Sequence, residues 1–256
     1  LTGWFIGMQD THIPHLRRRR VFYILHPRTF FFNGKSLVFE EKRGIMVISY
    51  QGGIAMLKGK TVLLGITGGI AAYKIPELIR LLVKQGAEVR CCCTHNALQF
   101  VTPLVLETLS NNQVYTDVFA PHNEHQTEHI SLPDWADLML VAPATANVIG
   151  KMANGIADDA LSTTFLAMQK PVLVAPAMNE NMLLHPALQR NLQTLRSFAH
   201  VTVLDCDEGF LACGTTGKGR MQEPEDLLDA VISVLSPKPL LGKRVLITAG
   251  PTQEKI

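Results

Sequence analysis

"TVLLGITGGIAAYKIPELIRLLVKQGAEVRCCC", residues 61–93, is the stretch of sequence that decides the fold. Residues 61–66 are a short apolar run that ends in a glycine turn, and apolar residues at helical spacing then fill residues 71–86 up to a closing Gly86. Residues 87–93 are a second apolar run. A strand, a helix and a strand in this order predict a βαβ unit.

The same alternation continues along the chain. Further apolar runs occupy residues 137–143, 171–177 and 200–205, and helical spacing extends to Met168, to Phe198 and over residues 224–235. Strands this uniformly apolar are buried on both faces, as in a parallel sheet that is covered by helices. We therefore expect a Rossmann-like three-layer α/β/α domain with a parallel sheet, over residues 56–236.

The first 55 residues differ from the rest of the chain. They contain nine of the seventeen aromatic residues, and their eight Lys or Arg against three Asp or Glu give a net charge of +5. No helical or strand period in them lasts beyond about six residues. We expect an N-terminal extension over residues 1–55 that shares no core with the domain and is disordered or foreign to the working protein.

Targeting signals are weak in this extension. The apolar segment "VFYIL" is too short for a secretory signal, and it is followed by His26 and Pro27. A mitochondrial transit peptide remains an alternative because residues 1–38 are rich in Arg and poor in acids, although Pro14 and Pro27 interrupt any helix. No apolar run reaches the roughly 20 residues of a membrane span, so we expect a cytosolic protein.

Residues 56–256 carry 16 basic and 19 acidic side chains, a net charge of −3. A slightly acidic body argues against nucleic acid as a partner. Near the end, "GKRVLITAGPTQEKI" (242–256) repeats the pattern of residues 59–70 after a proline-containing linker. We interpret residues 237–256 as a linker and the start of another α/β domain, of which too little is present to form a core.

The turn "GITGGI" follows a strand and precedes a helix, so the backbone N–H groups of Gly68 and Gly69 could hold a phosphate. A tight strand-to-helix turn without a ligand is the alternative. The second strand ends in Cys93 and Thr94 rather than in the Asp or Glu that binds the ribose of NAD. This disfavours NAD and leaves a mononucleotide phosphate compatible with the turn.

The other candidate side chains each have a structural alternative. His122, His125 and His129 follow an i, i+3, i+7 spacing, but no stable helix is signalled before Leu132, so we expect no metal site. His129 adjoins an apolar segment and could be a partly buried acid or base. Asn147 and Asn179 follow strand ends and could bind a ligand or cap a helix.

The five cysteines give no disulfide or zinc pattern. Residues 91–93 lie in a strand and Cys206 lies at a strand end, so we expect small core residues there. Cys213 lies in a glycine-rich loop, where it is either an incidental thiol or a functional one.

Six segments together resemble the flavin-dependent cysteine decarboxylases. They are "GITGGIAAYK" (65–74), "THNALQFVTPL" (94–104), "HISLPDWADLMLVAPATAN" (129–147), "NGIADDALSTTFLA" (154–167), "PVLVAPAMNENML" (171–183) and "ACGTTGKGRM" (212–221). The resemblance is strongest to the branch that acts on 4′-phosphopantothenoylcysteine in coenzyme A biosynthesis, where a phosphopantothenate–cysteine ligase is fused to the decarboxylase. The tail at residues 242–256 resembles the start of that ligase, whose activity we do not expect from this chain.

The resemblance implies a cofactor, a site and an assembly. The cofactor is FMN, and the implied binding residues are Thr67, Gly68, Gly69, Thr94, Pro143, Ala144, Thr145 and Asn147. The implied substrate-binding residues are Asn179, Met182, Ala212 and Cys213, of which Asn179 holds the substrate carboxylate. His129, Asn179 and Cys213 are implied as catalytic, and Cys213 lies on a flap over the substrate. The family also implies a homotrimer, or a multiple of it, with sites between subunits.

The implied reaction is an oxidation of the substrate thiol to a thioaldehyde, loss of CO₂, and reduction of the resulting enethiol to 4′-phosphopantetheine. The thioaldehyde serves as an electron sink. Without it, the carbanion left when a cysteine-derived carboxylate loses CO₂ would have nowhere to delocalise. A peptidyl-cysteine decarboxylase, a flavin prenyltransferase and a non-catalytic flavin-binding regulator are alternatives on the same scaffold. A prenyltransferase lacks the "HISL" and "ACG" pair, and a regulator does not need His129, Asn179 and Cys213 together.

Overall fold

The structure is a computed structural model that describes residues 55–119, 128–210, 214 and 216–238, together with the backbone of strands within the first fifty residues. The chain divides into two compact units. One combines Leu1–Met56 with Ser236–Ile256, and the other is Leu57–Leu235. Each unit is described by itself.

The first unit contains antiparallel strands. The short strands β1 (Met8–Gln9) and β2 (Val21–Phe22) pair with each other, and β3 (Phe30–Phe32), β4 (Lys35–Lys42) and β5 (Ile45–Tyr50) form a second sheet in that order. The sequence pattern did not predict these strands, because the apolar residues of β4 are consecutive rather than alternating. The two-residue spacing between β4 and β5, with Gly44 in it, is the hairpin signal that was available. The assignment of residues 1–55 as a separate extension stays a prediction.

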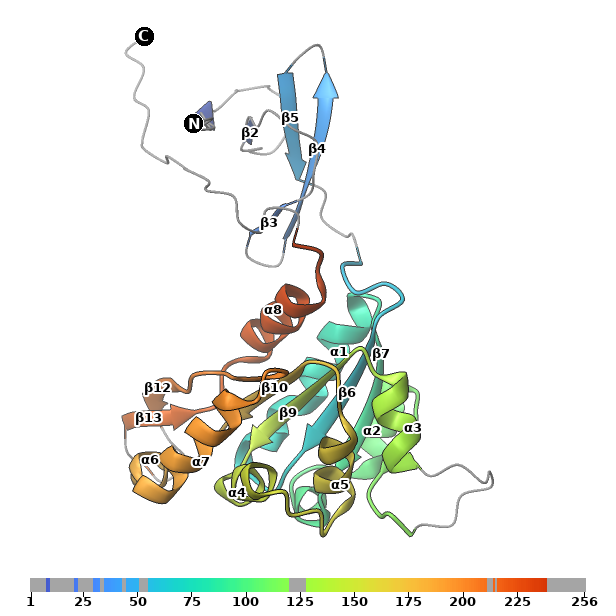
Figure 1. Cartoon of the computed structure of the whole chain (residues 1–256). Coiled ribbons are helices and arrows are strands. Elements are labelled where there is room, and N and C mark those ends of the chain that lie inside the picture. The colour runs from blue at the N-terminus through green and yellow to red at the C-terminus, as the bar shows by residue number, and fades with distance from the viewer. Residues whose placement is uncertain are drawn as a thin grey trace. The chain divides into compact units, whose positions relative to one another are not determined.

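The larger unit is built on a parallel sheet (Figure 1). Within the described residues the strand order is β11-β10-β9-β6-β7-β8, and every neighbouring pair is parallel. The strands are β6 (Thr61–Ile66), β7 (Glu88–Cys93), β8 (Val114–Tyr115), β9 (Leu138–Ala144), β10 (Val172–Pro176) and β11 (Val201–Val203). All seven residues of β9 are buried, as we predicted for strands covered on both faces.

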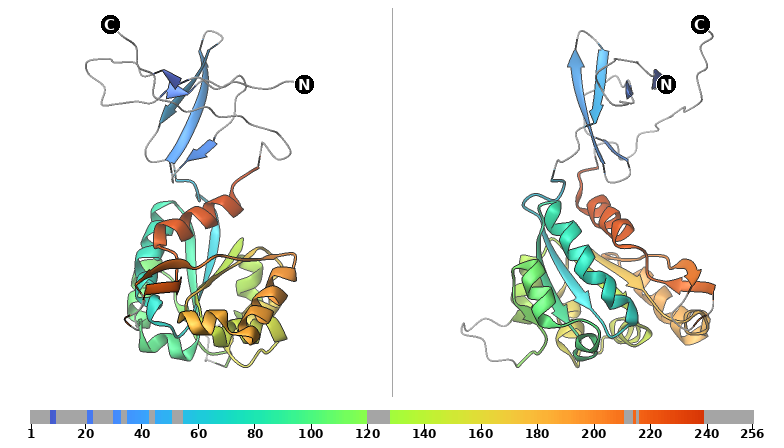
Figure 2. Two further views of the ribbon diagram at one scale, coloured as in Figure 1. Left: turned by 90° about the vertical axis from the view of Figure 1, so that its left-hand side faces the viewer. Right: turned by 180° about the vertical axis from the view of Figure 1, so that it is seen from behind.

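Helices cover both faces of this sheet (Figure 2), so the Rossmann-like three-layer α/β/α fold is confirmed. One face carries α1 (Ile75–Lys84), which follows the 3₁₀ helix η1 (Ile70–Lys74), with α2 (Pro103–Ser110) and α8 (Pro224–Leu235). The other face carries α3 (Glu128–Trp135), α4 (Ala146–Asn154), α5 (Ala160–Ala167) and α7 (Pro186–Ser197), and α7 also contacts the short α6 (Glu180–Leu184). The short 3₁₀ helix η2 (His95–Gln99) follows β7.

The strand order places a topological switch point between β6 and β9. From β6 the chain moves outward through β7 and β8, and it then returns to β9 on the other side of β6 and moves outward through β10 and β11. The loops that follow β6 and β9 therefore lead to opposite faces of the sheet and leave a crevice between them. Open parallel sheets bind ligands in such a crevice.

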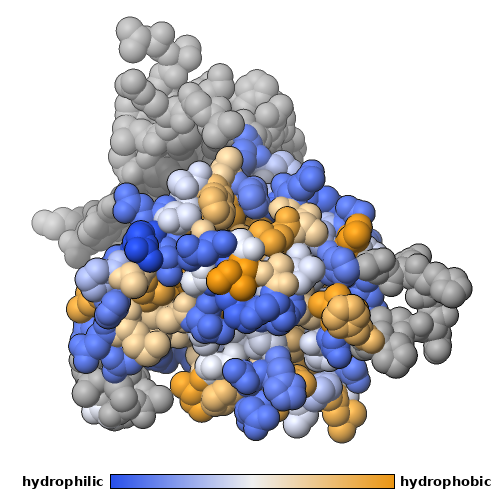
Figure 3. All heavy atoms as spheres, turned by 60° about the horizontal axis from the view of Figure 1, so that its bottom comes forward, coloured by the Kyte–Doolittle hydropathy of each residue, from blue (hydrophilic) through white to orange (hydrophobic). Residues whose placement is uncertain are grey.

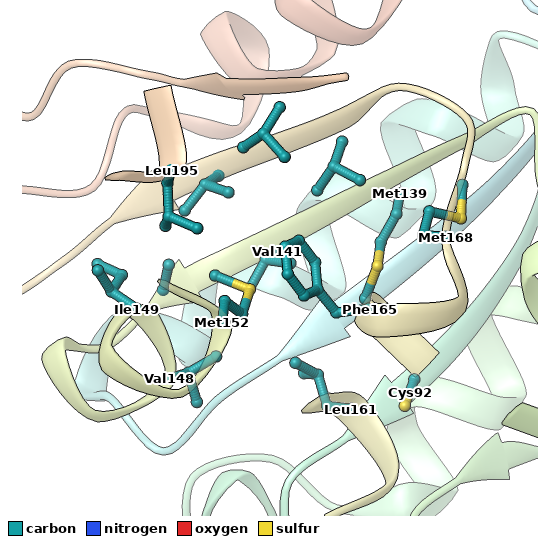
Figure 4. Close-up of a cluster of buried hydrophobic side chains, with 14 of the residues drawn as sticks. Cys92, Met139, Val141, Val148, Ile149, Met152, Leu161, Phe165, Met168 and Leu195 are labelled. Atoms are coloured by element: carbon teal, nitrogen blue, oxygen red, sulfur yellow. The ribbon is translucent and has the colours of Figure 1, made fainter. Parts of the chain in front are cut away.

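The core on one face of the sheet is formed by β9 and the helices above it. Figure 4 shows Met139 and Val141 of β9 beside Phe165, with Ile149 and Met152 of α4 nearby. These side chains are almost fully buried. At about 25 cal/mol per Å² of buried apolar area, this cluster is a main source of the stability of the unit and holds β9 in place at the crevice.

The cysteines of β7 are buried core residues, as the sequence predicted. Cys91, Cys92 and Cys93 are each at most 1% exposed, and Cys92 belongs to the core cluster. Cys206 is also buried and its thiol donates to the carbonyl of Pro176 at 3.3 Å. Burial raises the pKa of Cys93 to about 12 and the pKa of Cys206 to about 11, so both thiols remain protonated at neutral pH.

The structure differs from the sequence-based expectation at one helix. We expected no stable helix before Leu132, but α3 begins at Glu128. Intrinsic helix propensity does not explain this helix, because it contains Pro133. Its Leu132 and Pro133 are buried and the helix packs against α5, so tertiary contacts stabilise a segment whose sequence pattern is weak.

Two long helical stretches are interrupted. The stretch expected to end at Met168 is two helices, α4 and α5, because Gly155 adopts a left-handed conformation (φ 67°) that ends α4. The stretch through Phe198 is also two helices, since His185 ends α6 and caps α7 before Pro186. The hairpin of β12 (Asp207–Phe210) and β13 (Thr216–Arg220) was not predicted from the sequence. Among the described residues, none of the helices has the length and apolar character of a membrane span.

Candidate active site

A cavity of about 530 Å³ opens where the parallel strands end. Its walls come from the segments that follow β6, β9 and β10, and from the hairpin strand β13. The lining residues are Gly68, Gly69, Ile70, Ala71, Tyr73, Lys74, Thr145, Ala146, Ala177, Met178, Asn179, Met182, Gly219, Arg220 and Met221. On the face shown in Figure 3, apolar side chains lie among hydrophilic ones rather than in one continuous patch.

The loops after β6 and β9 are joined by hydrogen bonds through one buried hydroxyl. Thr67 donates to the carbonyl of Pro143 at 2.6 Å and accepts from the backbone N–H of Thr145 at 3.2 Å. The Thr145 hydroxyl in turn accepts from the N–H of Val148 and caps α4. These contacts bring together two segments that the sequence analysis assigned to one cofactor.

The glycine turn packs closely against the loop that follows β7. A Cβ at Gly68 would lie 2.5 Å from the Cβ of Asn96, and a Cβ at Gly69 would lie 3.3 Å from the Cγ2 of Thr145. Beside this turn, Thr94 is 8% exposed, and its buried hydroxyl has no hydrogen-bond partner within the described residues. A narrow glycine cradle next to an unpartnered hydroxyl suits a phosphate group.

The remaining predicted cofactor residues take different places. Ala144 is fully buried, and its carbonyl accepts from the N–H of Ala177 at 3.1 Å, which joins the end of β9 to the loop after β10. Asn147 is exposed and does not line the cavity. The structural alternative, that Asn147 caps a helix, is wrong because Thr145 caps α4, and the cofactor-binding role of Asn147 stays a prediction.

Asn179 and Met182 lie at the cavity on the side of β10. Asn179 caps α6, and its side-chain oxygen accepts from the N–H of Asn181 at 2.9 Å. The ligand-binding and helix-capping interpretations of Asn179 are therefore compatible, since the cap orients the amide at the cavity wall. Met182 is 49% exposed.

The β12–β13 hairpin is held against the segment that contains Asn179. The N–H of Met178 donates to the carbonyl of Gly219 at 3.0 Å, and the N–H of Lys218 donates to the carboxylate of Glu180 at 3.1 Å. Gly219 has a φ of 140°, and a Cβ there would lie 2.2 Å from the carbonyl oxygen of Met178. Only glycine allows this approach.

Two predicted site residues, Ala212 and Cys213, lie outside the described residues, in the connection between β12 and β13. His122 and His125 also lie outside them. In the part of the chain that is described, no group of three His, Cys, Asp or Glu side chains could hold a metal ion.

His129 is not brought to the cavity within one chain. It lies near the start of α3, is partly buried and does not line the cavity. Its Nδ1 atom is buried and has no hydrogen-bond partner among the described residues. The predicted meeting of His129 with Asn179 is therefore not formed by this chain alone.

An ion cluster at the cavity was missed by the sequence analysis. Lys74 Nζ lies 2.8 Å from Glu223 Oε2, and Arg220 pairs with the other carboxylate oxygen of Glu223. The hydrogen bond from Lys74, supported by the charges of Lys74 and Arg220, holds the pKa of Glu223 below its usual value. Lys74 ends the segment "GITGGIAAYK" quoted above, and Arg220 is the penultimate residue of "ACGTTGKGRM", which is the signal that could have found them.

The sequence model of the flavoprotein family matches residues 54–236. The chain belongs to the flavoprotein family. The match to this flavoprotein covers β6 to α8 and therefore the whole cavity described above.

Two curated relatives of the flavoprotein are coenzyme A biosynthesis bifunctional proteins named CoaBC. The protein from Bacillus subtilis is 50% identical over 204 residues, which cover 78% of this chain and 50% of the relative. The protein from Escherichia coli K12 is 44% identical over 201 residues, which cover 78% of this chain and 49% of the relative. The chain thus spans about half the length of these relatives.

Two solved structures similar to the flavoprotein are decarboxylases. A mutant PPC decarboxylase complexed with pantothenoylaminoethenethiol has a TM-score of 0.61 and 33% identity, and the match covers 67% of this chain and 96% of that one. The FMN-dependent cysteine decarboxylase SpaF has a TM-score of 0.62 and 30% identity, and the match covers 70% of this chain and 97% of that one.

Proposed function

We propose that this flavoprotein is the FMN-dependent enzyme that decarboxylates 4′-phosphopantothenoylcysteine to 4′-phosphopantetheine in coenzyme A biosynthesis. The observation that carries the proposal is the cavity at the switch point, where the glycine turn of Gly68 and Gly69 meets the segment of Asn179 and Met182. The likeness to CoaBC proteins and to PPC decarboxylase supports it. The cytosolic location inferred from the sequence remains a prediction.

The residues at the turn fit FMN. The backbone N–H of Gly68 and the buried hydroxyl of Thr94 would hold the cofactor phosphate, and Gly69, whose N–H donates to the Thr67 carbonyl at 2.8 Å, would let the phosphate approach the backbone. Thr67 and Thr145, which join the two loops, would fix the walls on either side. When bound, FMN supplies two-electron redox chemistry at the substrate thiol, which side chains cannot perform.

The Asn179 side chain would hold the substrate carboxylate. Its oxygen accepts from the N–H of Asn181, which fixes the direction of the side-chain amide at the cavity wall. A carboxylate held out of the plane of the neighbouring C=S group loses CO₂ most easily, because the breaking bond then overlaps with the electron sink. Met182, half exposed beside it, would cover the apolar part of the substrate.

The β12–β13 hairpin would close the cavity against water. Its anchor is the contact between Gly219 and Met178, next to Asn179. The connection between the two strands contains Ala212 and Cys213. After CO₂ has left, the Cys213 thiol would donate its proton to the carbon atom of the enethiol, and closure of the hairpin would protect that step from solvent.

His129 would act in the site of a neighbouring subunit. Within one chain it lies away from the cavity, yet its Nδ1 atom is buried and unpaired within the described part of the chain. A homotrimer, or a multiple of it, with sites between subunits would bring His129 of one copy to the cavity of the next. There the imidazole would serve as the base or electrostatic partner of the departing carboxylate.

The test is turnover by the purified protein. Purified protein should be yellow, and anaerobic incubation with 4′-phosphopantothenoylcysteine should release CO₂ and yield 4′-phosphopantetheine, identified by mass spectrometry. Release of CO₂ with an enethiol as the final product would instead indicate chemistry of the peptidyl-cysteine decarboxylase type. Bound flavin without CO₂ release would leave a flavin-binding regulator as the better description.

A further inference from the structure

The charged side chains that line the cavity are cationic. In the described part of its wall, Lys74 and Arg220 are the charged residues, and the other lining residues are glycine, alanine, apolar, aromatic or neutral polar. The two cations share the carboxylate of Glu223. Two positive groups and one negative group leave one positive charge at this end of the cavity.

The cations are positioned by different elements. Lys74 ends η1 and its side chain is 8% exposed, so its ammonium group is held close to Glu223 with little freedom. Arg220 ends β13, and its side chain is 41% exposed, which leaves part of its guanidinium group open to a ligand. Glu223 precedes α8, and its carbonyl accepts from the N–H of Leu227, so the carboxylate stands at the start of that helix.

We propose that Lys74 and Arg220 bind the terminal phosphate of the substrate and make the site selective for phosphorylated substrates. This inference rests on the proposed function. A phosphate monoester carries nearly two negative charges at neutral pH, and the guanidinium group of Arg220 can donate two parallel hydrogen bonds to it. Lys74 adds a point charge, while Glu223 keeps both cations in place before the substrate arrives.

FMN is a second source of a phosphate, but its place lies elsewhere. The glycine cradle and the Thr94 hydroxyl follow β6 and β7, whereas Arg220 belongs to the hairpin that contacts Met178 after β10. In the sheet, β7 and β10 lie on opposite sides of β6. Arg220 thus lies on a different side of the cavity from the glycine turn and can take the phosphate of the substrate, while Lys74, at the end of the 3₁₀ helix that follows the turn, reaches toward it through Glu223.

The experiment compares two ligands that differ only in this phosphate. Isothermal titration calorimetry measures binding of 4′-phosphopantetheine and of pantetheine to the FMN-loaded protein. The wild-type protein should prefer the phosphorylated ligand by about tenfold or more, the usual scale of a charge-assisted contact. Arg220→Gln and Lys74→Met should each remove most of this preference and leave the affinity for pantetheine within about threefold. Arg220→Gln disturbs folding less than Lys74→Met, because the side chain of Arg220 is partly exposed.

Lys218→Met is the matched control, since Lys218 lies on the same strand, is exposed and does not line the cavity. It should keep the preference of the wild-type protein. Equal affinity of the wild-type protein for both ligands would overturn the inference, and so would an unchanged preference in Arg220→Gln. Loss of flavin from the Arg220 and Lys74 variants would assign the cations to the FMN phosphate and would also overturn it. Failure of the wild-type protein to decarboxylate the substrate would refute the proposed function by a separate measurement.

Discussion

The hydroxyl of Thr67 donates a 2.6 Å hydrogen bond to the carbonyl of Pro143, a residue 76 positions further along the chain. This bond crosses the switch point between β6 and β9 and joins the two loops that border the cavity. Because the same oxygen also accepts from the N–H of Thr145, one side chain satisfies two backbone groups.

Replacement of Thr67 by Val should therefore loosen the site. The substitution leaves the Pro143 carbonyl and the Thr145 N–H without this partner, at a cost of about 1–3 kcal/mol. We expect a lower free energy of unfolding in urea and a lower ratio of flavin to protein after gel filtration. Thr67→Ser should restore both, and Thr108→Val, on an exposed face of α2, should change neither. Full flavin content in Thr67→Val would show that the loops are held together by other contacts.

Gly219 is predicted to be irreplaceable at the hairpin. Gly219→Ala would place a methyl group 2.2 Å from the Met178 carbonyl oxygen and would displace β13 from the segment of Asn179. We expect decarboxylation to fall by roughly 100-fold or more while FMN stays bound, since misplacement of about 1 Å has effects of this size. Gly155→Ala is the control, because Gly155 also has a positive φ but has open space around it. It should cost only about 1 kcal/mol of stability, and similar kinetics in the two variants would argue against the contact with Met178.

The Glu223 ion cluster should make stability depend on pH in the acidic range. The pKa of Glu223 is lower in the folded protein than its ordinary value of 4.5, chiefly because of the hydrogen bond from Lys74. A lowered folded pKa contributes stability that is present above the unfolded pKa and is lost as the pH falls through the folded pKa. The wild-type protein should thus be more stable than Glu223→Gln at pH 7, and the difference should shrink progressively below about pH 4.5.

Urea denaturation at a series of pH values measures this difference. Glu225→Gln is the control, because Glu225 lies in the first turn of the same helix α8 and is exposed. Its difference from the wild-type protein should be small. A Glu223→Gln difference that persisted unchanged at the acidic end of the series would mean that the cluster does not contribute through the charge of Glu223.

His129 gives a prediction about assembly. His129→Asn should keep FMN, because the glycine turn lies elsewhere, and should lower CO₂ release by about 100-fold, the scale of a lost acid or base. Asn179→Ala should also be inactive. If the site is shared between subunits, mixed oligomers of the two variants contain some intact sites and regain part of the activity. Mixtures that stay inactive after dissociation and reassembly would place the whole site within one chain.

Cys213 separates the two halves of the proposed reaction. Cys213→Ser should still release CO₂, because neither thiol oxidation nor decarboxylation needs its proton. The product should then be the enethiol, which lacks two hydrogen atoms relative to 4′-phosphopantetheine, since a hydroxyl is a far weaker acid than a thiol of pKa about 8.5. Mass spectrometry distinguishes the two products. Normal product at the wild-type rate would make Cys213 an incidental loop thiol.

The sequence predicted the layers of the domain because their signals are local. The apolar strands β6, β7 and β9 and the amphipathic helix α1 can be found within windows of a few residues. It missed the β12–β13 hairpin, whose strand Thr216–Arg220 contains two glycines and lacks an apolar residue. It placed the start of α3 too late because packing against α5 stabilises that helix.

The site was predictable only in part for a related reason. The glycine turn and the Asn179 motif are contiguous segments, and both were found at the cavity. Lys74 and Glu223 are 149 positions apart, and nothing in either neighbourhood signals the other. The place of His129 depends on a neighbouring copy in the proposed assembly, which one sequence does not describe.

The pairing of Lys74 with Glu223 also bears on how the protein is made. The ribosome synthesises the chain from its N-terminus, so Lys74 leaves the exit tunnel long before Glu223 and the helix α8 that follows it. Until Glu223 has been synthesised, burial of the Lys74 ammonium group would leave this charge without the carboxylate that stabilises it. We therefore expect nascent chains stalled before residue 223 to remain sensitive to proteases, and protection to be acquired once α8 has left the exit tunnel.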